Sequence, residues 1–164
     1  MRLIIAAVGR VRGPAPEMEL CDLYCERARA LGTKLGFTKL DVLAVDTSRL
    51  DLPAKRMTEE AARLVAKLPD ATHRIALDET GRAMTSEAFA THLAKLRDCG
   101  IRDIAFMIGG PDGLARDLKE NCNARLALGL QTWPHLLVRV LLAEQIYRAF
   151  AILSGHPYHR GGAC

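Results

Sequence analysis

Hydrophobic residues in this chain gather into five short runs, separated by longer segments of mixed polarity. The runs are rich in Ile, Val, Leu and Ala and cover residues 3–8, 40–45, 74–77, 104–108 and 126–128. A short continuous apolar run between polar residues is typical of a strand that is buried on both faces. We therefore expect five strands at these positions.

The segments between the runs have the spacing of helices. We expect helices over residues 17–31, 58–68, 86–96, 114–122 and 135–153. Thr58 and the pair Thr85-Ser86 stand before acidic residues, as is typical of helix starts. Strand and helix alternate, which predicts an α/β fold with a mostly parallel sheet flanked by helices. At 164 residues, the chain has the length of one domain, and we expect residues 1–164 to form it.

Charge and cysteine content narrow the class of protein only slightly. The formal net charge of +4 is compatible with a polyanionic partner, but many proteins of this basicity never bind nucleic acid. No apolar run approaches the roughly 18 residues of a membrane span, and no secretory leader precedes the five cysteines. We expect a cytoplasmic protein.

Cys21 and Cys25 are spaced to share a helix face, and without a second ligand pair we expect core residues rather than a metal site.

Three unusual segments follow the third, fourth and fifth apolar runs, at residues 78–81, 109–113 and 129–135. In an open parallel sheet, ligands bind beyond the carboxyl ends of the strands, so these segments are the expected site. Gly109 and Gly110 either let backbone approach a ligand closely or serve a tight turn through residue 113. The last segment is mostly apolar, which suits a flat heterocycle, although such a loop also plugs a sheet edge.

The final expected helix is apolar on several sides, so we expect most of it to be buried, with a subunit interface as the covering surface. Arg139 lies among these apolar residues, so its charge needs a carboxylate, carbonyl groups or a bound anion as a partner. We favour a structural pairing.

The tail after this helix, residues 156–160, reads His-Pro-Tyr-His-Arg. An aromatic ring beside Arg and His suits stacking on a base and contact with phosphate, as in the recognition of single-stranded RNA. The alternative is a tail that packs on the protein surface. Two histidines three apart do not complete a zinc site, because no further ligand has a suitable spacing.

With these segments in view, the chain resembles the bacterial ribosomal RNA large-subunit methyltransferase H family, a small member of the SPOUT class. The resemblance covers nearly the whole chain and is carried by residues 1–3, 7–9, Leu77-Asp78, Gly81, 108–114, 134–141, 144–149 and 156–160. The ordered combination is specific, although each motif alone is weak. Residues 161–164 extend beyond the end that the family pattern implies.

The resemblance implies a homodimer with a deep C-terminal trefoil knot that binds S-adenosylmethionine. By motif position, the cofactor-binding residues are Leu77, Gly109, Gly110, Leu128, Gly129, Leu130, Gln131, Thr132 and Trp133. The implied activity is methylation of N3 of a pseudouridine in large-subunit (23S) ribosomal RNA, on assembled ribosomes. No metal is implied.

For catalysis, the resemblance directs attention to the tail of one subunit beside the cofactor of the other. We expect His159 and Tyr158 to orient or deprotonate the base and Arg160 to contact phosphate, with His135 as the alternative base. Arg139 and Arg148 are expected at the interface or on the RNA backbone. The competing hypothesis is a non-catalytic ribosome- or RNA-binding module that retains the fold.

Overall fold

The computed structural model describes residues 1–159 and has a five-stranded sheet with the order β2-β1-β4-β3-β5. The strands are β1 (Arg2–Val8), β2 (Lys39–Val45), β3 (His73–Ala83), β4 (Asp103–Ile108) and β5 (Ala124–Ala127). Each of the four strand pairings is parallel. The predicted α/β class with a parallel sheet is confirmed.

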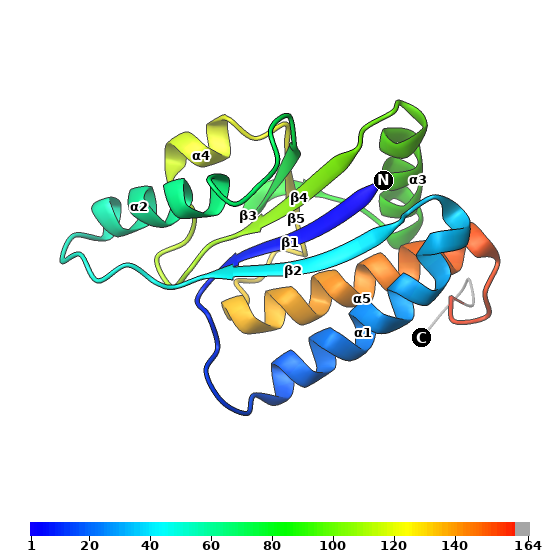
Figure 1. Cartoon of the computed structure of the whole chain (residues 1–164), viewed down its shortest axis with the longest axis horizontal. Coiled ribbons are helices and arrows are strands. Elements are labelled where there is room, and N and C mark those ends of the chain that lie inside the picture. The colour runs from blue at the N-terminus through cyan, green and yellow to red at the C-terminus, as the bar shows by residue number, and fades with distance from the viewer. Residues whose placement is uncertain (160–164) are drawn as a thin grey trace.

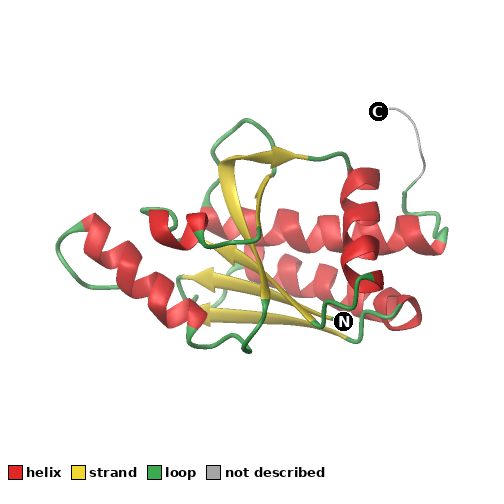
Figure 2. Ribbon diagram, turned by 90° about the horizontal axis from the view of Figure 1, so that it is seen from above, coloured by secondary structure: helices red, strands yellow, loops and turns green. Residues whose placement is uncertain are grey.

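Helices cover both faces of this sheet (Figures 1 and 2). They are α1 (Pro16–Gly32), α2 (Pro53–Val65), α3 (Ser86–Asp98), α4 (Arg116–Glu120) and α5 (His135–Ser154), with a 3-10 turn η1 (Thr33–Leu35) after α1. Figure 1 shows α1 and α5 side by side under one face, and α2 and α4 over the other. No helix in the described part of the chain is long and apolar enough to cross a membrane.

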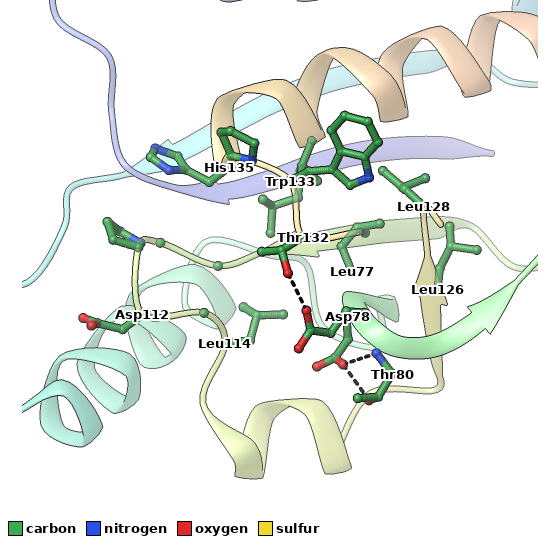
Figure 3. A pocket seen from close by; sticks show the side chains of 18 of the residues that line it. Leu77, Asp78, Thr80, Asp112, Leu114, Leu126, Leu128, Thr132, Trp133 and His135 are labelled. Atoms are coloured by element: carbon green, nitrogen blue, oxygen red, sulfur yellow. Dashed lines mark hydrogen bonds between the residues drawn. The ribbon is translucent and has the colours of Figure 1, made fainter. Parts of the chain in front are cut away.

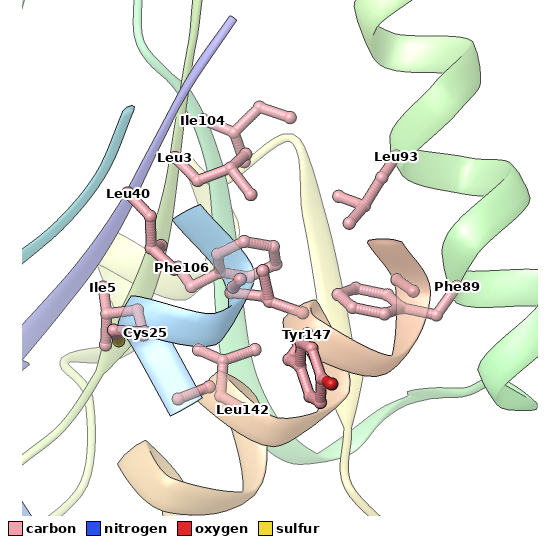
Figure 4. Close-up of a cluster of buried hydrophobic side chains, with 14 of the residues drawn as sticks. Leu3, Ile5, Cys25, Leu40, Phe89, Leu93, Ile104, Phe106, Leu142 and Tyr147 are labelled. Atoms are coloured by element: carbon pink, nitrogen blue, oxygen red, sulfur yellow. The ribbon is translucent and has the colours of Figure 1, made fainter. Parts of the chain in front are cut away.

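The alternation of side chains along β1 divides the core in two. Leu3, Ile5 and Ala7 belong to the cluster shared with α1, α3 and α5, part of which Figure 4 shows. Ile4, Ala6 and Val8 belong to the cluster under α2 and α4. Because successive side chains of a strand point to opposite faces, a central strand covered on both sides must be apolar throughout. This explains the continuous run from which the strand was predicted.

Helix α5 is enclosed mainly by its own chain. Nine of its residues are buried, and it packs along α1, against α3 and under the sheet. At the crossing with α1, Gly32 leaves room for Phe150, since an added β-carbon would lie 2.8 Å from that ring. The predicted burial of the helix is confirmed, and α1, α3 and the sheet supply most of it, while the expected subunit interface stays a prediction.

The start of one helix differs clearly from the prediction. Helix α2 begins at Pro53, not at Thr58, whose hydroxyl donates to the carbonyl of Ala54 inside the helix. Pro53 occupies the first helical position, where its fixed φ favours a helix start. By contrast, Thr85 caps α3 as predicted, its side chain accepting from the amide of Ala88 at 3.2 Å.

Strand β3 is longer than predicted and irregular. Both Leu77 and Arg82 are in register with Leu126 of β5, so residues 78–81 are extra in β3 and form what we call the 78–81 bulge. The segment was predicted to be a loop because it is polar, yet it lies within the strand. An added β-carbon at Gly81 would lie 2.8 Å from backbone atoms of β5, so only glycine fits where the bulge rejoins the sheet.

Candidate active site

A hollow of about 540 Å³ lies at the carboxyl ends of β3, β4 and β5, where the three unusual segments meet (Figure 3). All the residues predicted to bind a cofactor line it, except Leu130, and His135 lines it too. Leu130 is 94% exposed. The structure therefore brings the other predicted residues together around one hollow, while Leu130 lies outside its lining.

One wall of the hollow is apolar. Leu77 comes from β3, Ile108 from the end of β4, and Leu126 and Leu128 from β5 and the segment that follows it. Trp133 lies beside Leu128 in Figure 3 and is 40% exposed, so the indole has one free side. Apolar walls with a few polar groups are typical of sites for small heterocyclic ligands.

The 78–81 bulge supplies carboxylates to the opposite side. Asp78 is held by Lys119 at 2.7 Å and accepts from the amide and hydroxyl of Thr80. Burial by itself would raise the pKa of Asp78, but these hydrogen bonds outweigh it and lower the pKa to about 2. Asp78 is thus ionised, and its charge is balanced by that of Lys119.

Glu79 ties two of the site segments together. Its Oε2 accepts a hydrogen bond from the hydroxyl of Thr132 at 3.0 Å, which joins the bulge to the segment before α5 (Figure 3). Glu79 belongs to one of the three segments expected at the site, although it was not named as a binding residue, and Lys119 was not predicted. The carboxylates after the third apolar run were the available signal, because that edge of a parallel sheet is where ligands bind. Lys119 gave no local signal, since its partner is far away in the chain.

The glycine segment forms a tight turn, one of the two possibilities left open above. The amide of Gly113 donates to the carbonyl of Gly110 at 2.9 Å, and Gly113 has φ +86°. An added β-carbon at Gly109 would lie 2.4 Å from the carbonyl carbon of Gly113, so the turn itself requires glycine there. Asp112 is paired with Arg56 of α2 at 2.7 Å, which fastens the turn to that helix.

Behind this turn lies a buried acid, Glu60, that the sequence analysis did not single out. It is 3% exposed, and its Oε1 accepts from the amide of Ser48 at 2.8 Å. Its Oε2 has no hydrogen-bond partner among residues 1–159 and would lie 3.3 Å from a β-carbon at Gly110. The absence of a side chain at Gly110 therefore also makes room for this carboxylate.

Arg139 joins the start of α5 to the end of β1. Its Nη2 donates to the carbonyls of Val8 and Gly9 at 2.6 Å each, and the side chain is 1% exposed. The favoured structural pairing of Arg139 is confirmed, with carbonyl groups as the partners. The expectation that Arg139 lies at an interface or on RNA is not supported, because the residue is buried within its own chain.

His135 lies between the hydrogen bonds of Arg139, which we call the Arg139 clamp, and the hollow. An added β-carbon at Gly9 would be 3.4 Å from the Nε2 of His135. Burial, together with the nearby charge of Arg139, lowers the pKa of His135 below its ordinary value of 6.5. At neutral pH the imidazole is therefore uncharged and able to accept a proton.

The tail packs at the opposite end of α5. Tyr158 donates to Glu144 at 3.0 Å, and the guanidinium of Arg148, also paired with Glu144, lies 4.8 Å from the centre of its ring. His159 Nε2 is 2.9 Å from Glu87 of α3. Burial, hydrogen bonding with Tyr24 and the nearby carboxylate raise the pKa of Tyr158, so the phenol stays protonated.

Within one chain, the tail stays outside the hollow. Tyr158 and His159 fold back from the end of α5 onto Glu144 and Glu87, and neither residue lines the hollow. The structure therefore does not bring His159 and Tyr158 to the hollow of the same chain. Arg160 lies outside the described residues.

The histidines and cysteines form no metal centre in the described part of the chain. Residues 1–159 contain no group of three or more His, Cys, Asp or Glu side chains placed to hold an ion. Cys21 and Cys25 are both fully buried in the core cluster of α1 and α5. Their predicted role as core residues is confirmed.

Comparison with known proteins gives matches over nearly the full length. The family described as "Predicted SPOUT methyltransferase" matches residues 1–159. A ribosomal RNA large subunit methyltransferase H from Nitrobacter winogradskyi is 49% identical over 98% of this chain and 100% of its own length. The protein of the same name from Bradyrhizobium sp. is 47% identical, over 98% of each chain.

A more distant likeness is to the solved structure of the SpoU methyltransferase AviRb from Streptomyces viridochromogenes with the cofactor AdoMet. It is 14% identical with a TM-score of 0.39, covering 90% of this chain and 57% of that longer one. The assignment comes from the full-length sequence matches. The chain belongs to the SPOUT methyltransferase family and, within it, to the group of ribosomal RNA large subunit methyltransferase H proteins.

Proposed function

We propose that this protein transfers a methyl group from S-adenosylmethionine to N3 of a pseudouridine in large-subunit (23S) ribosomal RNA. The observation that carries the proposal is the hollow at the carboxyl ends of β3, β4 and β5, built by the segments that align with the family's motifs. The relatives that match the whole chain are named for methylation of this class of RNA.

The residues present fit S-adenosylmethionine. The volume of about 540 Å³ lies within the range of about 300–1,000 Å³ that is common for small-molecule sites. The apolar wall of Leu77, Leu126 and Leu128 suits an adenine ring. The carboxylate of Glu79, which accepts from the uncharged hydroxyl of Thr132, favours a cationic ligand nearby. When bound, S-adenosylmethionine supplies a methyl group on a positively charged sulfur, an electrophile that needs no further activation.

The chain's own residues then have two tasks, to position the base and to accept a proton. N3 of the base carries a hydrogen that must leave as the new N–C bond forms. His135 is uncharged at neutral pH and lines the hollow, so it is one proton acceptor in reach of the site. Holding the nitrogen in line with the methyl group supplies much of the acceleration.

His159 is the other candidate acceptor, and it requires a homodimer. Since His159 does not line the hollow of its own chain, it acts there as part of the tail of a second subunit. Apolar side chains remain exposed beside the hollow and on the neighbouring helix α1: Leu130, Trp133, Leu137, Leu20 and Leu23. Exposed apolar groups of this kind favour a subunit interface. In this arrangement Tyr158, which stays protonated, orients the base, and Arg160 contacts phosphate.

We place the reaction on assembled ribosomes in the cytoplasm, by the same resemblance. Residues 1–164 act as a single methyltransferase domain in this proposal. The C-terminal segment is threaded as the deep trefoil knot that the family implies. The non-catalytic module that binds RNA and has lost turnover is the competing outcome of the test.

The test has two stages. Calorimetry with S-adenosylmethionine is expected to show saturable binding, and no binding at millimolar cofactor would contradict the enzymatic proposal. Ribosomes that lack the modification are then incubated with labelled cofactor, and the label is mapped by mass spectrometry. Label on N3 of a 23S pseudouridine is expected, whereas label on transfer RNA, on protein or nowhere would refute the substrate assignment.

A further inference from the structure

A second hollow lies next to the first, at the carboxyl ends of β1 and β2, and the activity above assigns it no role. It has a volume of about 910 Å³ and is formed by the segments after β1 and β2 and by one side of α2. Figure 1 shows these two segments leaving the same end of the sheet. We call this surface the basic groove and define it by its five cations, Arg10, Arg12, Arg49, Arg63 and Lys67.

The basic groove has an excess of positive charge. Two carboxylates, Asp46 and Glu59, also line it, so the surplus is three charges in a chain whose formal net charge is +4. Asp46 is shared between Arg10 at 3.8 Å and Arg12 at 3.4 Å, and Glu59 pairs with Arg63 at 2.7 Å. Arg49 and Lys67 form no ion pair with any residue between 1 and 159.

The shape of the groove favours a long polyanion over a small anion. The side chains of Arg10, Arg12 and Arg63 are 50%, 78% and 42% exposed, so they face solvent and do not enclose a compact ligand. Their carboxylate partners hold them in place without neutralising the surface. Guanidinium groups spread along an open groove match the repeated phosphates of a nucleic acid strand.

The two hollows meet at one point. Gly9 lines the basic groove, His135 lines the first hollow, and a β-carbon at Gly9 would lie 3.4 Å from the Nε2 of His135. Arg139 holds this junction by binding the carbonyls of Val8 and Gly9. A strand that follows the groove as far as Gly9 therefore reaches the edge of the first hollow at His135.

We propose that the basic groove binds the phosphate backbone of the substrate RNA next to the nucleotide that is methylated. The inference rests on the proposed function, because it assigns a second contact surface to the same substrate. Phosphate contacts carry little sequence information, but they fix the register of the strand. The groove thus acts in placing the target base, and the first hollow acts in the chemistry.

The test compares two double variants that remove equal charge. Arg49→Ala with Lys67→Ala removes the two unpaired cations of the groove. Lys39→Ala with Arg102→Ala removes two exposed cations from the opposite edge of the sheet, where they line a separate hollow. Binding of a fluorescent 12-nucleotide oligouridylate is measured over a salt series, with the KM for unmodified ribosomes and calorimetry with S-adenosylmethionine.

The groove variant is expected to bind the oligonucleotide at least tenfold more weakly and to raise the KM for ribosomes, with cofactor affinity unchanged. For single strands, each lost phosphate contact reduces the slope of log K against log salt by about 0.7, so two reduce it by about 1.4. The control variant is expected to stay within twofold. Equal losses in both variants, or no salt-dependent binding by the unaltered protein, would overturn the proposal. The protein could bind no S-adenosylmethionine while the groove variant still binds the oligonucleotide more weakly than the control variant. That result would contradict the proposed function and support the assignment of the basic groove to RNA binding.

Discussion

The Nη2 of Arg139 lies 2.6 Å from the carbonyl oxygen of Gly9, at the point where β1 leaves the sheet. The same nitrogen is equally close to the carbonyl of Val8. One buried side chain therefore connects the start of the last helix to the end of the first strand, and both proposed binding surfaces border this connection.

Replacing Arg139 by Met is predicted to destabilise the fold. The change leaves two buried carbonyl groups without this donor, which costs about 2–4 kcal/mol in the free energy of unfolding. Urea denaturation followed by circular dichroism measures it. Arg116→Met is the control, since that side chain is 86% exposed and, among residues 1–159, pairs with Glu120 alone; a change of less than about 0.5 kcal/mol is expected there. Equal stability of the two variants would show that the clamp is not structural.

Stability is predicted to fall as the pH drops below the ordinary histidine pKa of 6.5. Burial lowers the pKa of His73, His92 and His135 in the folded chain. The unfolded chain therefore binds more protons in this range, and protonation favours unfolding. The carboxylates with lowered pKa values, such as Asp78, lose their contribution only at more acidic pH.

Urea denaturation between pH 7.5 and 5.5 measures this effect. His92→Gln is expected to flatten the dependence, because the Nε2 of His92 is buried without a hydrogen-bond partner among residues 1–159. A stability that is the same at both ends of the range would contradict the prediction.

The single tryptophan is predicted to report cofactor binding. Trp133 lines the first hollow and no other tryptophan occurs in the chain, so its emission should change saturably as S-adenosylmethionine is added. Leu128→Ala removes part of the apolar wall, worth up to about 1.5 kcal/mol, and should weaken binding about tenfold. Leu52→Ala, at an exposed leucine outside the lining, is the matched control and should stay within about twofold. Similar losses in both variants would mean that the ligand lies elsewhere.

His159→Ala is predicted to slow methyl transfer by a factor of about 10² or more, the usual effect of losing a general base. Cofactor affinity should be retained, because His159 does not line the hollow of its own chain. Single-turnover transfer with ribosomes measures the rate. Glu87→Gln, which weakens the 2.9 Å contact to His159, should give a smaller loss. Normal turnover by His159→Ala would exclude the tail from catalysis and leave His135 as the acceptor.

The sequence predicted the parts of the fold that depend on local pattern. The strands were found because a strand covered on both faces is apolar at every position, as β1 is. The start of α3 was found from its cap at Thr85. The extent of α5 was found to within one residue from its apolar spacing. The start of α2 was missed because its signal is Pro53 at the first helical position, whereas Thr58 before two acidic residues resembles a cap but lies inside the helix.

The remaining features depend on contacts between distant positions. Lys119 meets Asp78 only because α4 folds back over the bulge, and His159 meets Glu87 across 72 residues. The sequence around Lys119 and His159 does not indicate which residues they contact. The residues of the 78–81 bulge do not alternate between polar and apolar as strand residues do. Their place within β3 could therefore not be predicted from the local sequence. The site segments were nevertheless identified, because the carboxyl edge of a parallel sheet follows from the order of elements alone.

The register of β3 has a consequence for how this site can change. The strand pairs with Leu126 both before and after the 78–81 bulge, so the sheet on either side is indifferent to how many residues the bulge contains. Lengthening or shortening it ahead of Gly81 would reshape the acidic side of the hollow and leave the strand alignment intact. This segment is therefore where a library of insertions would alter ligand preference at the lowest risk to folding.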